Sequence, residues 1–248
     1  MSTSKEYTAL LALVTQQARA GDAQAQLALG QLLLNGIGTG RDEQTAFRWF
    51  LASALQGQAM GCNMVGRCRE LGWGVALNTA EAMPWYRRAA QGGLDWGMYN
   101  YATGLTLGWH GVRDHDAAFL WFRRAAALGH CKSFNIIGGF YEDGWACPRD
   151  LRRARGWYVA AARCGDFRGH FNYGRFLLCE NRLEDAAYHF ELARQSGTAA
   201  FVEKMDAFLS KTGGMEPPAL VPLSGGKPDR AVLNEYAVEC IMDKAIEG

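Results

Sequence analysis

Few residues of this chain have the types and the spacing that catalysis or metal binding would need. His110 and His115 stand five positions apart beside Asp114 and Asp116, and a metal ion could use such donors. No HExxH motif or Cys/His cluster accompanies them, so solvated turn residues explain the group better. The glycines of residues 36–40 (GIGTG) follow a helical pattern, whereas a phosphate-binding loop follows a strand. With no GxSxG or paired-carboxylate motif, we predict no enzyme, no metal and no cofactor.

The cysteines favour a structural role over a redox role. There are seven, an odd number, and no CxxC motif occurs. Reduced cysteines serve as small apolar residues in a core, which is the interpretation we prefer for all seven. The apolar run at residues 9–14 is too short for a signal peptide. These features predict a reducing compartment and a cytoplasmic location.

Two arginine pairs could bind carboxylates. Arg87 with Arg88 and Arg123 with Arg124 recur at an interval of 36 residues. Residues 83–170 around them hold twelve Lys/Arg and seven Asp/Glu, a net charge of +5, whereas the whole chain carries +1. The pairs are either an ordinary solvated face or a surface for an acidic peptide or another protein. The nearly neutral chain argues against nucleic acid, and the absence of an 18-residue apolar run argues against a membrane span.

Three further tryptophans recur at the same interval: Trp73, Trp109 and Trp145. They either stack on neighbouring helices or form an aromatic ridge along one edge, and tryptophan is a frequent anchor residue in protein interfaces.

The interval of 36 residues runs through most of the chain and indicates the elements that position these side chains. The strongest marker is a tryptophan followed by Phe or Tyr, at Trp49, Trp85, Trp121 and Trp157. Asp or Asn stands seven residues before each tryptophan, Ala three before and Gly eight after. Small or apolar residues at −3, 0, +1, +4, +5 and +8 from the tryptophan form one buried helix face. We call this element helix A.

A second element, helix B, follows each helix A. Its interior carries Gly at position +17 in four repeats (Gly30, Gly66, Gly138 and Gly174), which indicates a site where two backbones approach too closely for a side chain. Glycines at +8 and +23 suit left-handed residues at helix ends, and the Asp or Asn at −7 suits a helix N-cap.

This set of columns resembles the Sel1-like repeat, a relative of the tetratricopeptide repeat. Segments such as WYRRAAQGG at 85–93 and WFRRAAALG at 121–129 carry the resemblance, which covers residues 5–211. It implies an all-α, right-handed solenoid of about six helix–turn–helix repeats, the last one shortened. It also implies a protein-interaction scaffold.

The repeat pattern stops after residue 211. Residues 212–228 hold four of the six prolines and predict an extended linker. Residues 229–246 predict an amphipathic C-terminal helix, which docks on its own chain, on a second copy or in the solenoid groove.

From the sequence we therefore predict a non-enzymatic scaffold or adaptor that binds a partner through a concave helical surface. The alternative is a regulatory protein that is controlled by its own tail and responds to a small molecule or a metal.

Overall fold

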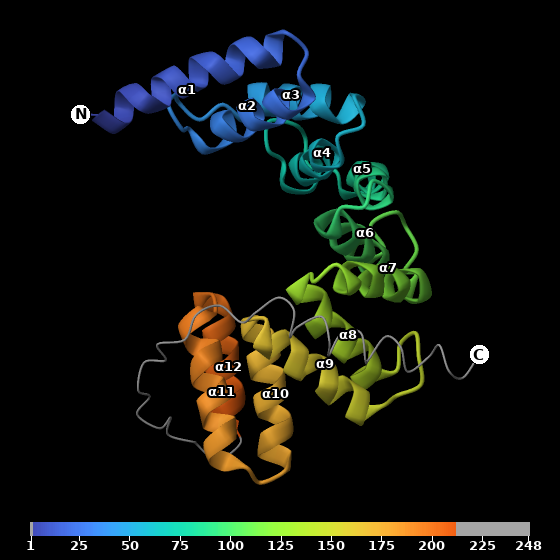
Figure 1. Ribbon diagram of the computed structural model, residues 1–248. Helices are drawn as coiled ribbons and strands as arrows, with labels where there is room; N and C mark the ends of the chain where they lie inside the picture. Colours follow the sequence, from blue (N-terminus) through green and yellow to red (C-terminus); the bar gives the residue numbers. More distant parts are fainter. Residues whose placement is uncertain (1, 212–248) are drawn as a thin grey trace. The chain divides into compact units, whose positions relative to one another are not determined.

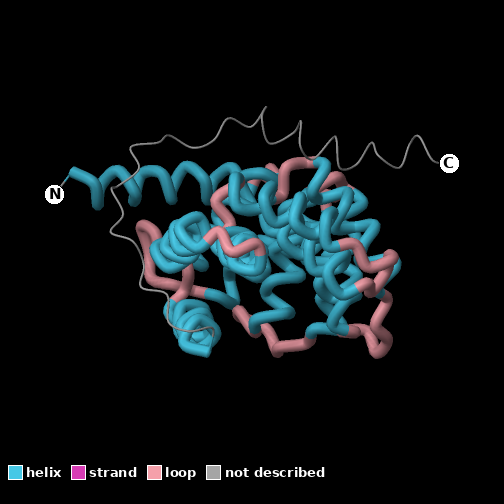
Figure 2. The backbone as a smooth tube through the Cα atoms, turned by 90° about the horizontal axis from the view of Figure 1, so that it is seen from below, coloured by secondary structure: helices cyan, strands magenta, loops and turns pink. Residues whose placement is uncertain are grey.

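The computed structural model describes residues 2–211, and every regular element in that range is a helix (Figure 1, Figure 2). The described elements are α1 (Ser2–Arg19), α2 (Ala23–Asn35), α3 (Glu43–Leu55), α4 (Ala59–Leu71), α5 (Thr79–Gln91), α6 (Asp95–Leu107), α7 (His115–Ala127), α8 (Cys131–Asp143), α9 (Leu151–Arg163), α10 (Phe167–Cys179), α11 (Leu183–Ser196) and α12 (Ala199–Lys211). Over these residues the predicted all-α fold and its six helix pairs are confirmed, with odd-numbered helices in the A position and even-numbered helices in the B position. The predicted linker over 212–228 and the predicted helix over 229–246 lie outside the described residues.

The chain divides into two compact units, Met1–Trp121 (unit 1) and Phe122–Gly248 (unit 2), with the boundary inside α7. Successive helices pack on one another from α1 to α6 in unit 1 and from α8 to α11 in unit 2. Each unit has its own core. One core cluster in unit 1 includes Phe50 and Val65, and one in unit 2 includes Leu177 and Phe190. Such contacts between sequence neighbours are what a helical repeat array needs for stability.

The predicted helix ends are confirmed. At each N-cap the side-chain oxygen accepts a hydrogen bond of 2.9–3.1 Å from the backbone N–H three residues later. The four N-cap residues are Asp42, Asn78, Asp114 and Asp150. The glycines at +8 all have φ between 81° and 83°: Gly57, Gly93, Gly129 and Gly165. Those at +23, where helix B ends, have φ between 67° and 75°: Gly36, Gly72, Gly108 and Gly144. Residues with a Cβ are strained in this left-handed region, so glycine fixes both turns of the repeat.

The centre of each repeat is the aromatic residue after the tryptophan rather than the tryptophan itself. The aromatic side chains at +1 are at most 2% exposed: Phe50, Tyr86, Phe122 and Tyr158. Of the four tryptophans at position 0, only Trp157 is fully buried, at 1% exposed, and the other three are half-buried. The prediction that both columns lie on the buried face is therefore wrong for three tryptophans, which lie at the border of that face.

The glycines at +17 make room for these rings. A Cβ added at one of these glycines would lie only 2.5–2.7 Å from the aromatic ring in the +1 column of the next helix A. This holds for all four of them: Gly30, Gly66, Gly138 and Gly174. The predicted close approach is confirmed, but the neighbour is a ring and not a second backbone. Two backbones do meet at position +12, where an added Cβ would lie 2.6–2.8 Å from backbone atoms of the preceding helix A, at Gly61, Gly97 and Gly169.

Two of the cysteines are paired, which differs from the sequence-based prediction. Cys131, at the start of α8, and Cys164, at the end of α9, form a disulfide with a Cα–Cα distance of 5.6 Å. The prediction that all seven cysteines are reduced is therefore wrong for this pair. The repeat columns concealed the pairing because the two residues stand at different offsets from their tryptophans, +10 and +7. A cytoplasmic location stays a prediction, now without support from the cysteines.

The remaining described cysteines are free, and two of them, Cys62 and Cys68, are buried. Burial raises the pKa of Cys68 to about 12, so this thiol behaves as the small apolar residue that the sequence predicts.

Candidate interaction surface

The first arginine pair lies near the end of α5, on the face away from the core. Arg87 and Arg88 are both exposed, as their positions +2 and +3 require. The guanidinium of Arg88 lies over the ring of Trp85, 4.9 Å from its centroid. Arg87 has no hydrogen bond or ion pair with any residue in the described range. A half-buried tryptophan therefore positions one guanidinium, and the other is available to a ligand.

The second pair occupies the same positions of α7. Arg124 is exposed and Arg123 is half-exposed. Because the boundary between the two units lies just before Phe122, this pair belongs to unit 2, whereas Arg87 and Arg88 belong to unit 1. Each pair is thus a local feature of its own helix.

The three tryptophans at +24 differ in exposure. Trp73 is half-buried, with the guanidinium of Arg67 at 5.4 Å from its ring centroid. Trp109 is half-buried against Tyr86, at 6.4 Å between ring centroids. Trp145 is 53% exposed, and its ring meets that of Phe140 edge-on at 5.6 Å. Trp145 therefore offers the most surface to a partner.

Sequence reasoning missed a set of polar pairs between successive B helices. The side-chain amide of Asn100 in α6 donates to the Asn63 oxygen in α4 at 2.9 Å. Asn172 in α10 donates to Asn135 in α8 at 2.8 Å. All four stand 14 or 15 residues after a tryptophan, a recurrence that could have identified them. Because buried amides need partners, these pairs fix how one helix B lies on the next.

A tyrosine–carboxylate contact also recurs. The Tyr86 hydroxyl donates to Glu70, and the Tyr158 hydroxyl donates to Glu142, the latter at 2.6 Å. Glu142 also forms an ion pair with Arg175 at 2.8 Å. Burial opposes ionisation of Glu142, but the bonds from Tyr158 and Arg175 outweigh it and lower the pKa of the carboxyl. These carboxylates hold the buried tyrosines in place.

Two histidines in unit 2 form a second feature that the sequence did not reveal. The Nδ1 atoms of His170 in α10 and His189 in α11 lie 2.9 Å apart. Burial, with a smaller contribution from His189, lowers the pKa of His170 to about 4. Both imidazoles are therefore neutral at pH 7, and one ring donates a hydrogen bond to the other.

The described residues contain no group of three or more His, Cys, Asp or Glu that could hold a metal ion. His110 is an exposed turn residue, as predicted, whereas His115 and Asp116 lie in the first turn of α7 and His115 is half-buried, so the interpretation of the group as solvated turn residues is wrong for these two. Over the same part of the chain, no helix combines the length and the apolar character that crossing a bilayer requires.

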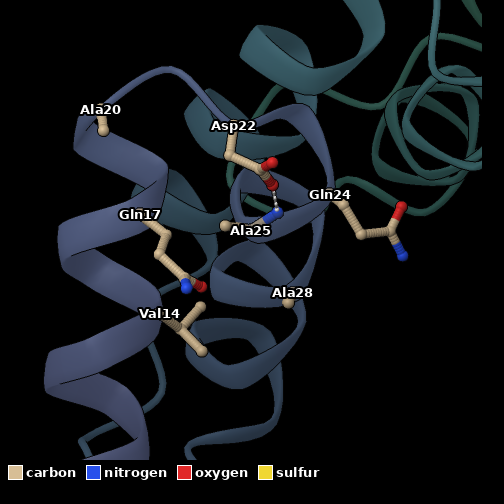
Figure 3. Close-up of a pocket in the computed structure, with 7 residues that line it drawn as sticks. All are labelled: Val14, Gln17, Ala20, Asp22, Gln24, Ala25 and Ala28. Atoms are coloured by element: carbon tan, nitrogen blue, oxygen red, sulfur yellow. Dashed lines mark hydrogen bonds between the residues drawn. The ribbon is translucent and has the colours of Figure 1, made fainter.

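A cavity of about 480 Å³ lies between α1 and α2 at the N-terminal end of the array (Figure 3). Its lining is mostly aliphatic or amide, from Val14, Gln17 and Ala28 among others, and Asp22 is its only carboxylate. That carboxylate accepts the backbone N–H of Ala25 at 2.6 Å and so serves as a helix cap. The cavity contains no set of groups that could act as acid, base or nucleophile.

Stacked helix pairs, glycine-capped turns and a periodic aromatic core define a helical-repeat protein. A family model described as Sel1 repeat matches residues 23–58, 59–94, 96–130 and 137–166. These ranges cover more than half of the chain, which belongs to the Sel1 repeat family. Three of the matches begin at the start of helix B or one residue later, at 23, 59 and 96, so the family repeat pairs each helix B with the following helix A. The contact between the +17 glycine and the next aromatic ring is therefore internal to one repeat.

Solved structures share this fold. A Sel1 repeat protein from Oxalobacter formigenes matches with a TM-score of 0.78 and 22% identity, over 94% of this chain and 92% of that one. A protective antigen from uropathogenic Escherichia coli strains, displaying an SLR fold, matches with a TM-score of 0.71 and 23% identity. The match covers 98% of this chain and 50% of the antigen. No curated protein matches the chain.

Proposed function

We propose that this chain is a non-enzymatic scaffold that binds a partner protein, or an acidic peptide segment of one, through the exposed faces of α5 and α7 around Arg88 and Arg124. Membership of the Sel1 repeat family supports the general class, since these repeats are generally protein-interaction scaffolds. The observation that carries the proposal is the exposed arginine pair on α5, where Arg87 has no protein partner in the described range and Arg88 is positioned by Trp85.

The chemistry of the pairs supports an anionic ligand. A guanidinium presents two parallel N–H groups that match a carboxylate, so such pairs select acidic side chains or a chain terminus. Residues 83–170 carry a net charge of +5, from twelve Lys/Arg and seven Asp/Glu, which favours encounter with an acidic partner. Neither Arg88 nor Arg124 lies in the buried stripe, so binding needs no change in the core.

Quantitative affinity capture from the native host tests this proposal. The tagged wild-type chain is compared with an Arg88→Ala/Arg124→Ala variant and with an Arg113→Ala control, which removes an exposed arginine in a turn. We expect a set of proteins that the wild type and the control both capture and that the double variant loses. Equal capture by all three folded proteins would reject these faces, and the Trp73, Trp109 and Trp145 column would then be the better candidate.

A further inference from the structure

The net positive charge of the described residues lies entirely in unit 2. Residues 1–121 hold nine Lys/Arg and nine Asp/Glu, whereas residues 122–211 hold fourteen and ten, a net charge of +4. Residues 212–248, which follow α12 directly, hold three Lys/Arg and six Asp/Glu, a net charge of −3. The segment that follows this basic set of repeats in the chain is thus of opposite charge.

Three of the four exposed large apolar side chains in the described part of unit 2 occur where a helix B gives way to the next helix A; the fourth, Leu128, lies between α7 and α8. Trp145 lies in the turn after α8, Leu151 begins α9 and Leu183 begins α11, and they are 53%, 45% and 48% exposed. Arg155 of α9 forms an ion pair with Glu180, just after α10, at 3.2 Å. The first turns of α9 therefore lie beside the turn that leads into α11, so the three side chains belong to the same end of the helix pairs.

An arginine without a partner lies at this end. Arg152 is exposed and forms no hydrogen bond or ion pair with any residue between 2 and 211, whereas its neighbour Arg153 pairs with Asp150 at 3.4 Å. We call Trp145, Leu151, Arg152 and Leu183 the turn edge. It presents half-exposed apolar groups and one unpaired cation, a combination typical of a docking surface for an amphipathic segment with acidic residues.

The segment over 229–246 has the complementary composition. Its predicted helix carries an apolar stripe and, beside it, four acidic residues against two basic ones. The members of the stripe are Leu233, Tyr236, Ala237, Cys240, Ile241 and Ala245. The 17 residues over 212–228 span at most about 56 Å, so the length of the connection permits docking on unit 2.

We propose that residues 229–246 dock on the turn edge of their own chain. The apolar stripe covers Trp145, Leu151 and Leu183, and a carboxylate of the segment faces Arg152. The proposal goes beyond the scaffold function and concerns a different face from Arg88 and Arg124. Either proposal can therefore fail without the other. Docking would give the array a built-in occupant at its C-terminal unit.

Hydrogen–deuterium exchange of the full chain, followed by mass spectrometry, tests the docking. We expect peptides from 229–246 to exchange at least about tenfold more slowly than an unstructured peptide of the same sequence, because docked helical amides are protected. Exchange at the unstructured rate in the wild type would overturn the proposal. Protection that disappears on dilution, together with a shift from dimer to monomer, would show docking on a second copy and would also overturn it.

Two variants localise the contact. Trp145→Ala should raise the exchange rate of 229–246 about tenfold, and Arg152→Glu should raise it about threefold to tenfold. The matched controls are Trp96→Ala, at a tryptophan of unit 1 that is 38% exposed, and Arg113→Glu, which should both leave it unchanged. Because Arg152 is exposed and has no partner, its variant should keep the helical circular dichroism signal. Unchanged protection in both turn-edge variants would place the segment elsewhere and reject the proposal.

Discussion

Two adjacent glycines in α8 allow a stringent test of how the repeat packs. A Cβ added at Gly138 would lie 2.5 Å from the Cε1 atom of Tyr158, whereas one added at Gly139 would meet only the Tyr158 hydroxyl, at 3.9 Å. Both substitutions by alanine remove the same backbone entropy penalty, which is worth about 1 kcal/mol in a helix. Any difference between the two variants therefore measures the contact with the ring.

The ring has little room to move. Tyr158 is 2% exposed, and its hydroxyl donates to Glu142 at 2.6 Å. Overpacking of this kind costs about 1–3 kcal/mol. After the gain in helix propensity, we expect Gly138→Ala to destabilise the protein by up to about 2 kcal/mol and Gly139→Ala to stabilise it by up to about 1 kcal/mol.

Thermal melting followed by circular dichroism measures the difference. For a chain of this size, 1 kcal/mol corresponds to about 2–4 °C, so two variants that differ by about 1–3 kcal/mol should melt roughly 2–12 °C apart, with Gly138→Ala the less stable. Equal melting temperatures of the Gly138→Ala and Gly139→Ala variants would show that the +17 glycine does not make room for the aromatic ring.

Two further perturbations concern unit 2. Reduction of the disulfide, or Cys131→Ser, should lower the melting temperature, because closing a loop of 33 residues stabilises the fold by about 3–4 kcal/mol. The control Cys179→Ser, at an exposed free cysteine, should leave the melting temperature unchanged. A melting curve that is the same with and without reductant would contradict the disulfide. The pKa of His170 is lowered to about 4 from its ordinary value of 6.5. Between pH 6.5 and about pH 4, the imidazole is therefore protonated in the unfolded chain and neutral in the folded chain. Stability should therefore fall by about 3 kcal/mol as pH drops through this window. His170→Gln should flatten that dependence and His110→Gln should retain it; identical pH profiles for both variants would refute a neutral pair with His189.

The sequence predicted the features that recur in a fixed column. The N-cap at Asp42, the left-handed glycine at Gly57 and the six helix pairs all follow from a spacing of 36 residues. Each of these depends on one residue type at one position, so the pattern is visible in a single chain. The Sel1 repeat resemblance follows from the same columns and is confirmed by the family match.

The remaining features depend on three-dimensional contacts between residues at different offsets. Cys131 and Cys164 differ by 33 positions and so break the 36-residue register, yet they meet because both lie at the end of the helix pair where α8 begins and α9 ends. His170 and His189 are 19 residues apart, lie on two successive helices, α10 and α11, and stand at different offsets in the pattern. The burial of Trp157 but not of Trp85 likewise depends on which neighbours surround each ring, which one column of residues does not reveal.

The most direct test of the scaffold function is the affinity of a captured partner for the Arg88→Ala/Arg124→Ala variant. Each arginine contact at a partly solvated surface is worth about 1 kcal/mol, so titration should give a Kd about ten- to thirtyfold higher than for the wild type. The Arg113→Ala control should bind as the wild type does, and circular dichroism should show that all three proteins are folded. An unchanged Kd in the folded double variant would contradict the assignment of the binding surface to α5 and α7.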